Sequence, residues 1–534
     1  MFFMTALLYR KIWDKLNGSV GGSALLIAFF SIISKLLGLL RDRLLASYFG
    51  AGSTLDAYYA AFKLPDLIFN TLVLGALAAA FIPLFTKIWL QDKERAIKFS
   101  NVVLNYLLLI LVLLSAGVFI FAKQLMPLIV PGFAPEVLAQ TILLTRIMLG
   151  SIVFFSLSNV IGGVLNARKK FFSFSLAPVF YNFGIILGIV FLYPRIGLTG
   201  LAWGVVFGSA LHFLIQLPEV IKNGWHYSFD WRIFPEVKRC FQLMIPRTIG
   251  LAASQINLLV VTMITSTLAA GSLAIFTFAN NLESFPTSII GVSLAVAAFP
   301  IFSESLAMRD DKRFVSAFSM HFRRMVFLII PLSLLFIILR AQIVRIILGS
   351  GSFDWDDTYH TAQTLGWFSV SLFAQTLIPL LARAFYALED TMTPVVISLV
   401  SVGINIGASI YLGHSWGVEG LAAAFSISAI FNMAALLFVL RMRLGDLDDK
   451  NLIRSTFKIT FNSIVAVFIS YLMLRVMSSL VDMQTFWGVF WQAGVATIIG
   501  LIVYLILAKL TKSQEIKIIF EMLNKLRLQL KAKN

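Results

Sequence analysis

The sequence has one cysteine and five histidines in 534 residues, and only 13% of its residues are charged. A single cysteine, Cys240, excludes a disulfide framework within the chain, and the histidines show no ligand spacing, so no metal site is expected. There is no Walker-type phosphate loop, which argues against ATP hydrolysis by the chain itself. Residues 1–22 lack the apolar core and small-residue cleavage site of a signal peptide. These absences predict that the protein holds no metal or other cofactor and does not itself hydrolyse ATP.

Hydrophobic residues, in contrast, make up 59% of the chain, whereas soluble domains are about 25% charged and much less apolar. The apolar runs are long and nearly continuous, which favours membrane-spanning helices over a barrel. The predicted fold class is an all-α polytopic membrane protein. Fourteen apolar segments can be counted, at 24–50, 55–87, 99–122, 137–166, 171–193, 197–221, 240–266, 271–305, 322–348, 360–387, 394–413, 417–441, 455–479 and 486–508.

Lysine and arginine are distributed unequally between alternate loops. With the N-terminus placed inside, the inner loops, the tail and the adjoining span ends hold 32 of the 43 basic residues, and the outer ones hold four. Short cytoplasmic loops are enriched in Lys and Arg, so both termini are predicted to be cytoplasmic. The net charge of +17 then reflects membrane topology, and no nucleic-acid partner is expected.

Two short phrases recur along the chain. GLTGLA at 197–202 resembles GVEGLA at 417–422, and AAFIPLF at 79–85 resembles VAAFPIF at 296–302. Six spans separate the copies, so both copies face the same way, as in a parallel repeat. We predict an N-lobe with helices 1–6, a C-lobe with helices 7–12 and two further helices. The corresponding ranges are 1–23 (cytoplasmic segment), 24–225 (N-lobe), 226–445 (C-lobe), 446–511 (helices 13 and 14) and 512–534 (basic amphipathic tail).

The first span carries four ionisable side chains: Lys35, Arg41, Asp42 and Arg43. Each would cost about 2.5–3.5 kcal/mol if it faced lipid, so they are expected to face a polar interior. Helical spacing places Lys35 and Asp42 on one stripe, flanked by Arg41 and Arg43. This pattern indicates an anion-binding site at membrane depth. The alternative is a helix end at which the arginines extend to the interface and Asp42 pairs with a neighbour.

The second span adds polar residues at helical spacing, namely Asp56, Lys63 and Asn70. Asp56 is predicted to lie near the outer end, where its carboxylate could pair with a cation of the first span. In the second half, Asn281 and Glu283 are the polar counterparts. Glu283 is a functional candidate, or alternatively a partner for Arg247. From Lys509 the tail reads as a basic amphipathic helix that binds the anionic inner leaflet.

Longer phrases of the sequence resemble one known family. SKLLGLLRDRLLASYFGAG, LDAYYAAFKLPD and GALAAAFIPLF occur in order, followed by GGVLNARKKFFSFSLAPVFYN, ESFPTSIIGVSLAVAAFP and LARAFYALEDTMTPVVISLVSVGIN. Over about residues 24–445 the chain resembles the MurJ (MviN) family of bacterial lipid II flippases, within the multidrug/oligosaccharidyl-lipid/polysaccharide exporter superfamily. The resemblance implies fourteen helices, two six-helix lobes and a cationic central cavity. It also implies cavity roles for five residues: Lys35, Arg41, Asp42, Asp56 and Lys63.

The chain departs from the family pattern at several positions. Phe69 or Asn70, and Asn281, are neutral where some members carry cavity arginines. The seventh and eleventh spans contain no Asp or Glu, although some members bind sodium there. The resemblance therefore implies a rearranged phosphate clamp that uses Arg247 or Arg146. The driving force is expected to be the membrane potential or an ion gradient.

Together, these features predict a lipid II flippase of the bacterial cytoplasmic membrane that works by alternating access. Its expected partners are lipid II, membrane lipids and cell-wall synthesis enzymes, and a monomer is expected. Two alternatives remain. The first is a flippase for another lipid-linked oligosaccharide, of O-antigen or capsule type. The second is a non-transporting cell-wall scaffold, against which the Arg41–Asp42 pair argues, because a scaffold has no need of buried charge.

Overall fold

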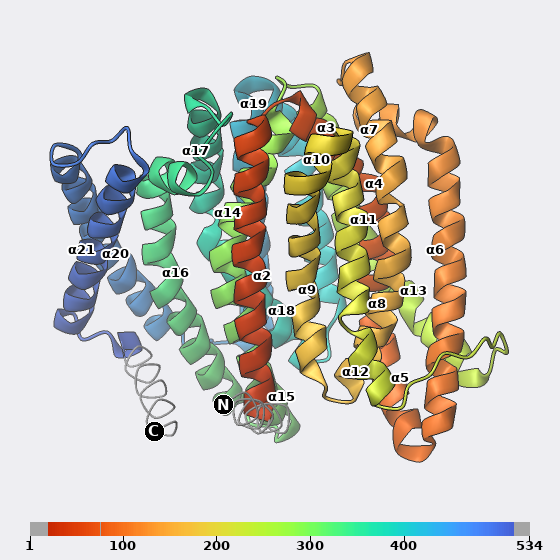
Figure 1. Cartoon of the computed structure of the whole chain (residues 1–534). Coiled ribbons are helices and arrows are strands. Elements are labelled where there is room, and N and C mark those ends of the chain that lie inside the picture. Colours follow the sequence, from red (N-terminus) through yellow and green to blue (C-terminus); the bar gives the residue numbers. More distant parts are fainter. Residues whose placement is uncertain (1–19, 75, 517–534) are drawn as a thin grey trace, which may run out of the picture. The chain divides into compact units, whose positions relative to one another are not determined.

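The computed structural model describes residues 20–74 and 76–516, and every regular element in them is a helix (Figure 1). Most of the predicted cytoplasmic segment 1–23 and of the basic tail 512–534 lies outside the described residues. The elements are α2 (Val20–Phe49), α3 (Ser53–Ala61), α4 (Lys63–Phe69), η1 (Asn70–Leu74), α5 (Ala76–Gln91), α6 (Lys93–Ile129), α7 (Pro135–Met148), α8 (Gly150–Ala167), α9 (Phe171–Leu187), η2 (Gly188–Leu192), α10 (Tyr193–Ile196), α11 (Thr199–Leu214), α12 (Leu217–Lys222), α13 (Pro235–Ser266), α14 (Ser272–Pro286), η3 (Thr287–Val292), α15 (Ser293–Ala307), α16 (Asp311–Ile347), α17 (Trp355–Val370), α18 (Leu372–Ala387), α19 (Met392–Leu444), α20 (Asp449–Ser478), α21 (Phe486–Leu510) and η4 (Gln514–Ile516).

The predicted all-α polytopic class is confirmed. Among the described residues, nine helices are long and apolar enough to cross a membrane, and the number is ten if α17 and α18, bent by 43°, form one span. Helix α2, with its four ionisable side chains, is not among the nine. The second predicted span, 55–87, is divided into α3, α4, η1 and α5. The predicted total of fourteen spans stays a prediction.

The chain divides into two compact units, residues 1–274 and 275–534. The predicted lobes instead meet between residues 225 and 226. Helix α13 accounts for the difference, because it packs on α5, α6 and η1 and so belongs to the first unit. The boundary between functional lobes stays a prediction. Each unit has its own aromatic-rich core, with Phe81, Phe85 and Phe99 in the first and Phe302, Phe314 and Phe318 in the second.

The two recurring phrases adopt similar local structures. Gly197 has φ 63° and ψ −149°, and Gly417, at the matching place in the second phrase, has φ 66° and ψ −142°. This left-handed conformation favours glycine, and in both phrases a helix follows directly. Helices α6 and α16 are also alike: each has 37 residues, and each begins at an aspartate, Asp92 or Asp310, whose side chain accepts a backbone N–H three residues on.

Three of the spans contain π-helical turns, at η1, η2 and η3. Such turns interrupt the regular hydrogen bonding of a helix and are often found at functional sites. Pro286, which has no backbone N–H to donate, immediately precedes η3. In the second span, η1 lies only a few residues beyond Lys63, so the backbone changes its helical geometry close to the polar stripe predicted from the sequence.

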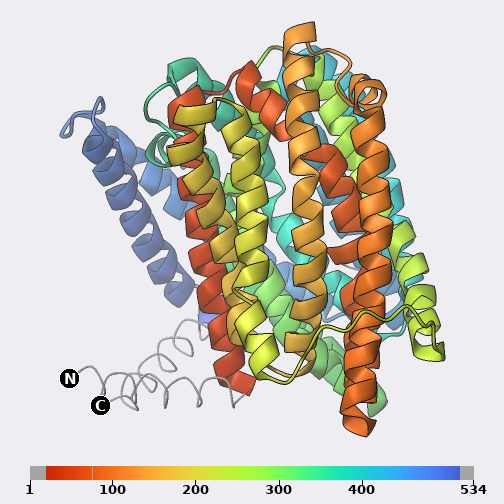
Figure 2. The ribbon, with the colours of Figure 1, turned by 45° about the vertical axis from the view of Figure 1, so that its right-hand side comes forward.

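Within the first unit, α9 packs between α2 and α11 (Figures 1 and 2). Glycines make the close approach of α9 and α11 feasible: a Cβ on Gly184 would clash with the backbone of Gly208, and a Cβ on Gly188 would clash with Gly204. Small residues at helix interfaces are a general means of close packing in membranes. The contact places the middle of α9 against the charged part of α2.

Candidate functional site

The centre of the site is the pair Arg41 and Asp42 on α2. The Nε and Nη2 atoms of Arg41 donate hydrogen bonds to Oδ1 of Asp42, at 3.0 and 2.8 Å. The Asp42 side chain is 3% exposed and the Arg41 side chain 21% exposed. Asp42 is therefore enclosed by protein, while Arg41 keeps an accessible edge. A paired, hydrogen-bonded charge is the form in which ionisable groups are tolerated away from water.

Asn182 of α9 fixes the other side of the guanidinium. Its Oδ1 accepts a hydrogen bond from Arg41 Nη1 at 3.2 Å, and its Nδ2 donates to the backbone carbonyl of Ser34 at 3.1 Å. All three Arg41 nitrogens thus have partners within the first unit. A planar guanidinium with several fixed donors is held in one orientation, which a lysine ammonium would not be.

The other predicted cations lie on α2 and on α4. Lys35 and Arg43 are half-buried on α2. Lys63 is half-buried at the start of α4 and interacts electrostatically with Asp66, one turn further along. Asn70 is half-buried at the start of η1. The middle of α2 therefore carries three cations and one carboxylate, with Arg41 and Arg43 on opposite flanks of the stripe that holds Lys35 and Asp42. This excess of positive charge suits an anion.

Asp56 has a different environment from the one expected. Its side chain is buried on α3, and its carboxylate oxygens accept the backbone N–H groups of Gly271, at 2.6 Å, and Ala274, at 2.9 Å. Ala274 lies in the first turn of α14, so Asp56 acts as a cap for that helix. Among the described residues no ion pair joins Asp56 to α2, and the expected pairing with a first-span cation is replaced by this cap.

The remaining predicted residues are separate. Glu283 of α14 is buried, and its Oε1 accepts a hydrogen bond from Thr287 at 3.2 Å. Asn281 is half-buried on the same helix. The side chain of Arg247 lies outside the described residues, so its suggested pairing with Glu283 stays a prediction. Arg146, in the last turn of α7 and inside the span Pro135–Ala167, donates to the carbonyl of Phe119 and lies over the Phe119 ring.

Two side chains that interact with Arg41 were not identified from the sequence. Asn182 was one of them, although the signal was present: it is the only amide or charged residue in the apolar stretch 171–193. Tyr58 was the other; it is buried on α3 and interacts electrostatically with Arg41. Nothing in the sequence marks this tyrosine as different from its neighbour Tyr59, because both fit an ordinary buried helix face.

The arrangement is suited to binding and not to covalent chemistry. It offers fixed, charge-assisted N–H donors at an accessible edge, which match the oxygens of a phosphate or carboxylate. In the part of the chain that the structure covers, no cluster of three or more His, Cys, Asp or Glu side chains could hold a metal ion.

Comparison with solved structures first defines the class of protein. The chain is similar to an inward-facing transporter of the multidrug resistance MATE family of the MOP superfamily, with a TM-score of 0.66 and 17% identity, over 78% of this chain and 96% of that one. An outward-facing MATE transporter gives a TM-score of 0.60 at 17% identity, over 81% of this chain and 98% of that one. At these identities the likeness concerns the fold alone. The chain therefore has the fold of a polytopic helical transporter.

The family follows from closer relatives. The family model described as lipid II flippase MurJ matches residues 45–506, and this protein belongs to that family. A structure described as lipid II flippase MurJ in an inward closed conformation is 28% identical, with a TM-score of 0.78 over 91% of this chain and 98% of that one. The probable lipid II flippase MurJ of Rickettsia prowazekii is 32% identical over 418 residues, which are 78% of this chain and 82% of that protein. The probable lipid II flippase MurJ of Thermotoga maritima is 29% identical over 490 residues, 91% of this chain and 96% of that protein. The resemblance inferred from the sequence is confirmed.

The family match does not extend over the whole site. It begins at residue 45, after Lys35, Arg41, Asp42 and Arg43, and includes Asp56, Lys63 and Asn182. The roles of the α2 cations therefore rest on their own geometry.

Proposed function

We propose that this protein moves lipid II from the inner to the outer leaflet of the bacterial cytoplasmic membrane by alternating access, in support of peptidoglycan synthesis. It is a transporter of the MurJ family and not an enzyme. The observation that carries the proposal is the orientation of Arg41 by Asp42 and Asn182 on a membrane helix, in a chain of this family. The relatives named above are described as lipid II flippases.

The first step of the proposed mechanism is capture of the headgroup. Lipid II carries a pyrophosphate and an anionic peptide, neither of which crosses hydrocarbon unpaired. The accessible edge of Arg41, with Lys35 and Arg43 on the same helix, supplies charge-assisted donors to the phosphate oxygens. Lys63 adds a further cation. Asn182 stays bonded to Arg41 and keeps its plane fixed while the anion binds.

Asp42 has a role in the empty protein. An isolated buried cation is costly in the membrane, so a carrier that returns without substrate needs a substitute anion. Asp42 provides it, since two Arg41 nitrogens bond to one of its oxygens. Substrate phosphate and Asp42 then compete for the same guanidinium. This exchange lets the site bind an anion in one direction and return neutralised in the other.

The finer architecture is part of the proposal. We assign fourteen spans, two six-helix lobes in parallel repeat, helices 13 and 14, two cytoplasmic termini and a monomer. The charge distribution supports the orientation, and the matching turns at Gly197 and Gly417 support the repeat. Asp56 serves as a positioning residue that holds the start of α14, and Asn70, Asn281, Glu283 and Arg247 are secondary cavity candidates. Membrane potential or an ion gradient drives turnover.

Genetic rescue tests the proposal. The chain is expressed in bacteria depleted of their own lipid II flippase, and lipid II in the outer leaflet is measured with a periplasmic probe. We expect restored exposure with the native chain and none with Arg41→Ala. The matched control is Arg475→Ala, which removes an exposed arginine of α20 that is bonded to Tyr471; we expect this variant to transport normally. Good membrane expression without lipid II exposure would refute the proposal.

A second candidate substrate is another lipid-linked oligosaccharide. The neutral side chains at Phe69 or Asn70, and at Asn281, where some members of the family carry arginines, favour it. A transport assay with lipid II and an O-antigen-type lipid donor side by side separates the two. Preference for the second donor would reassign the substrate while retaining the flippase mechanism.

A further inference from the structure

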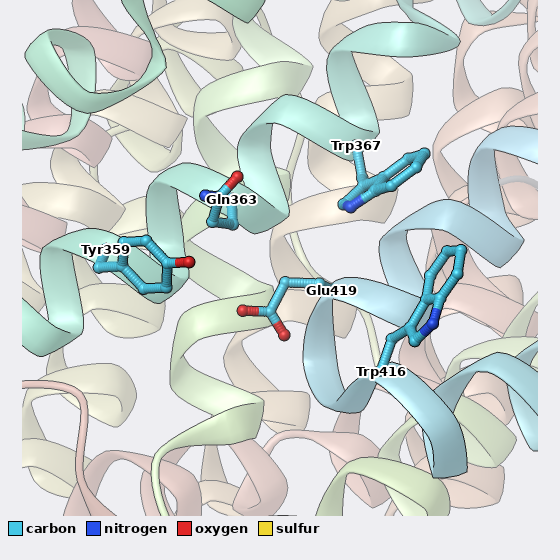
Figure 3. A pocket seen from close by; sticks show the side chains of 5 residues that line it. All are labelled: Tyr359, Gln363, Trp367, Trp416 and Glu419. Carbon is cyan, nitrogen blue, oxygen red and sulfur yellow. The ribbon is translucent and has the colours of Figure 1, made fainter.

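The second unit contains a cavity of about 240 Å³ that is distinct from the α2 site. It is lined by Tyr359, Gln363 and Trp367 of α17 and by Trp416 and Glu419 of α19 (Figure 3). The three α17 residues are spaced four apart, so they form one stripe along the helix. The indoles of Trp367 and Trp416 stack on each other, with ring centroids 5.6 Å apart at 26°.

The only carboxylate among these lining residues is held in a fixed position. His360 Nδ1 lies 2.6 Å from Glu419 Oε1, and the second nitrogen of this histidine lies 3.8 Å from Asp356. A carboxylate has two oxygens with several lone pairs, so Glu419 keeps further acceptor capacity for a ligand beside this contact. Figure 3 shows the Glu419 side chain extending from α19 toward the side of the cavity on which Tyr359 lies. Glu419 follows Gly417, whose left-handed backbone turns the chain at this point.

The mixture of polar groups identifies the class of ligand. Glu419 only accepts hydrogen bonds, the indole nitrogens only donate, and the Gln363 amide and the Tyr359 hydroxyl do both. A sugar ring matches this mixture, since each hydroxyl donates and accepts while the C–H face packs on an aromatic ring. An ammonium group offers donors alone and would leave the amide and indole N–H groups without a use. Tyr359 and Trp416 are 53% and 52% exposed, so ring surface is accessible.

An aromatic belt at the membrane interface is the ordinary explanation for exposed tryptophans. Belt residues present their rings to lipid and headgroups individually. Here three aromatic side chains instead line one cavity together with a carboxylate and an amide. A carboxylate that faced lipid would be costly, so this cavity is suited to a polar occupant.

We propose that this aromatic cavity is a saccharide-binding site at the outer end of the second unit. The location rests on the proposed function, because the positive-inside pattern assigns the start of α17 and the turn at Gly417 to the outside. The site receives a sugar ring, either on the headgroup of a translocated lipid or as a free oligosaccharide.

A binding measurement on the full chain in lipid nanodiscs tests the site. The probe is N,N′-diacetylchitobiose, and its contact with the protein is read by saturation-transfer NMR and by quenching of tryptophan fluorescence. Loss of one stacking ring or of the acceptor is expected to weaken binding about tenfold, in Trp416→Ala and in the isosteric Glu419→Gln. Trp487→Ala, which removes an exposed tryptophan of α21, is the matched control and should bind as the native chain does.

The outcomes separate the site from the proposed function. Saturable binding that both variants weaken supports the site, even if the native chain fails to flip lipid II. Absence of saturable binding, or equal binding by all variants, overturns it, even if flipping is normal. Addition of lipid II to the nanodiscs distinguishes the sources: displacement of the disaccharide identifies a lipid-borne sugar, and no displacement identifies a free one.

Discussion

The carboxylate of Asp56 accepts the backbone N–H of Gly271 at 2.6 Å, across 215 positions of sequence. Gly271 has φ 91°, a conformation that favours glycine, and a Cβ there would clash with the carbonyl of Ala51. The bond joins the start of α3 to the segment that begins α14. An acidic residue at the amino end of a helix also complements the helix dipole. Asp56 therefore has a structural role, because its hydrogen bonds hold the start of α14 against α3.

We expect Asp56→Ala to destabilise the protein and to lower transport. The change leaves two buried N–H groups without an acceptor, and each costs about 1–3 kcal/mol. Asp56→Asn retains one accepting oxygen and should have an intermediate effect. Asp92→Asn is the matched control, because Asp92 also accepts a backbone N–H at a helix start but is exposed. Thermal stability by fluorescence-detected gel filtration, with flippase rescue, measures both effects. Native thermal stability in Asp56→Ala would show that these two hydrogen bonds do not stabilise the protein.

The apolar pattern and the charges gave most of the fold. In lipid, the backbone of a long apolar run can satisfy its hydrogen bonds within the run only as a helix. The similar phrases at Gly197 and Gly417 correspond to two turns of the same kind. Pro65 and Pro83 marked the second span for possible bends, but its division into α3, α4, η1 and α5 was not predicted, because a proline does not show where the hydrogen bonding of the helix changes. Nor did the sequence indicate that α13 would pack with the first unit, which depends on long-range contacts.

The candidate site was predictable in part. Buried charge in an apolar helix is costly, so Arg41 and Asp42 could be singled out from the sequence alone. The hydrogen-bond partners of Asp56 could not be predicted, because they are backbone N–H groups, which every residue except proline possesses. Asn182 was detectable as an isolated amide in an apolar span. Its pairing with Arg41 required knowledge of which helices are adjacent.

Replacement of Asn182 tests whether the orientation of Arg41 matters. Asn182→Leu removes the acceptor for Nη1 and the link to Ser34, and we expect transport to fall about tenfold, in line with loss of a hydrogen bond to a charged group. Asn182→Asp should reduce transport further, since a second carboxylate would hold the guanidinium against the substrate phosphate. Initial rates of lipid II exposure at matched expression give the comparison.

Asn159→Ala is the control for this series. Asn159 is half-buried on α8 and donates to the carbonyl of Phe155 in its own helix, so its loss should leave transport at the native level. Faster transport by Asn182→Asp than by Asn182→Leu would contradict the proposed competition between phosphate and carboxylate.

Close packing of α9 on α11 is expected to be essential for folding. Gly208→Leu places a large side chain where even a Cβ would clash with the backbone of Tyr181, so the two helices must separate. We expect loss of the folded fraction, since overpacking of a tight interface costs about 1–3 kcal/mol or more. Gly117→Leu on α6, where a Cβ meets nothing within 4 Å, should be tolerated. The folded fraction after detergent extraction is the measurement, and equal yields of the two variants would argue against a constrained α9–α11 contact.

Arg41→Lys separates charge from geometry. Lysine keeps the positive charge, but its single ammonium cannot reproduce the planar arrangement in which Nε and Nη2 bond to Asp42 while Nη1 bonds to Asn182. If positive charge alone attracts the substrate, Arg41→Lys should transport nearly as well as the native chain. If the fixed orientation of the donors matters, it should resemble Arg41→Ala in rate while still binding the lipid anion. We expect the second result, with transport reduced about a hundredfold by loss of fixed charge-assisted donors.

Initial rates combined with equilibrium binding of lipid II distinguish the two cases. The control is Arg441→Lys. Arg441 lies in the last turn of α19 and forms an exposed ion pair with Asp449 of α20, so the same exchange should have no effect there.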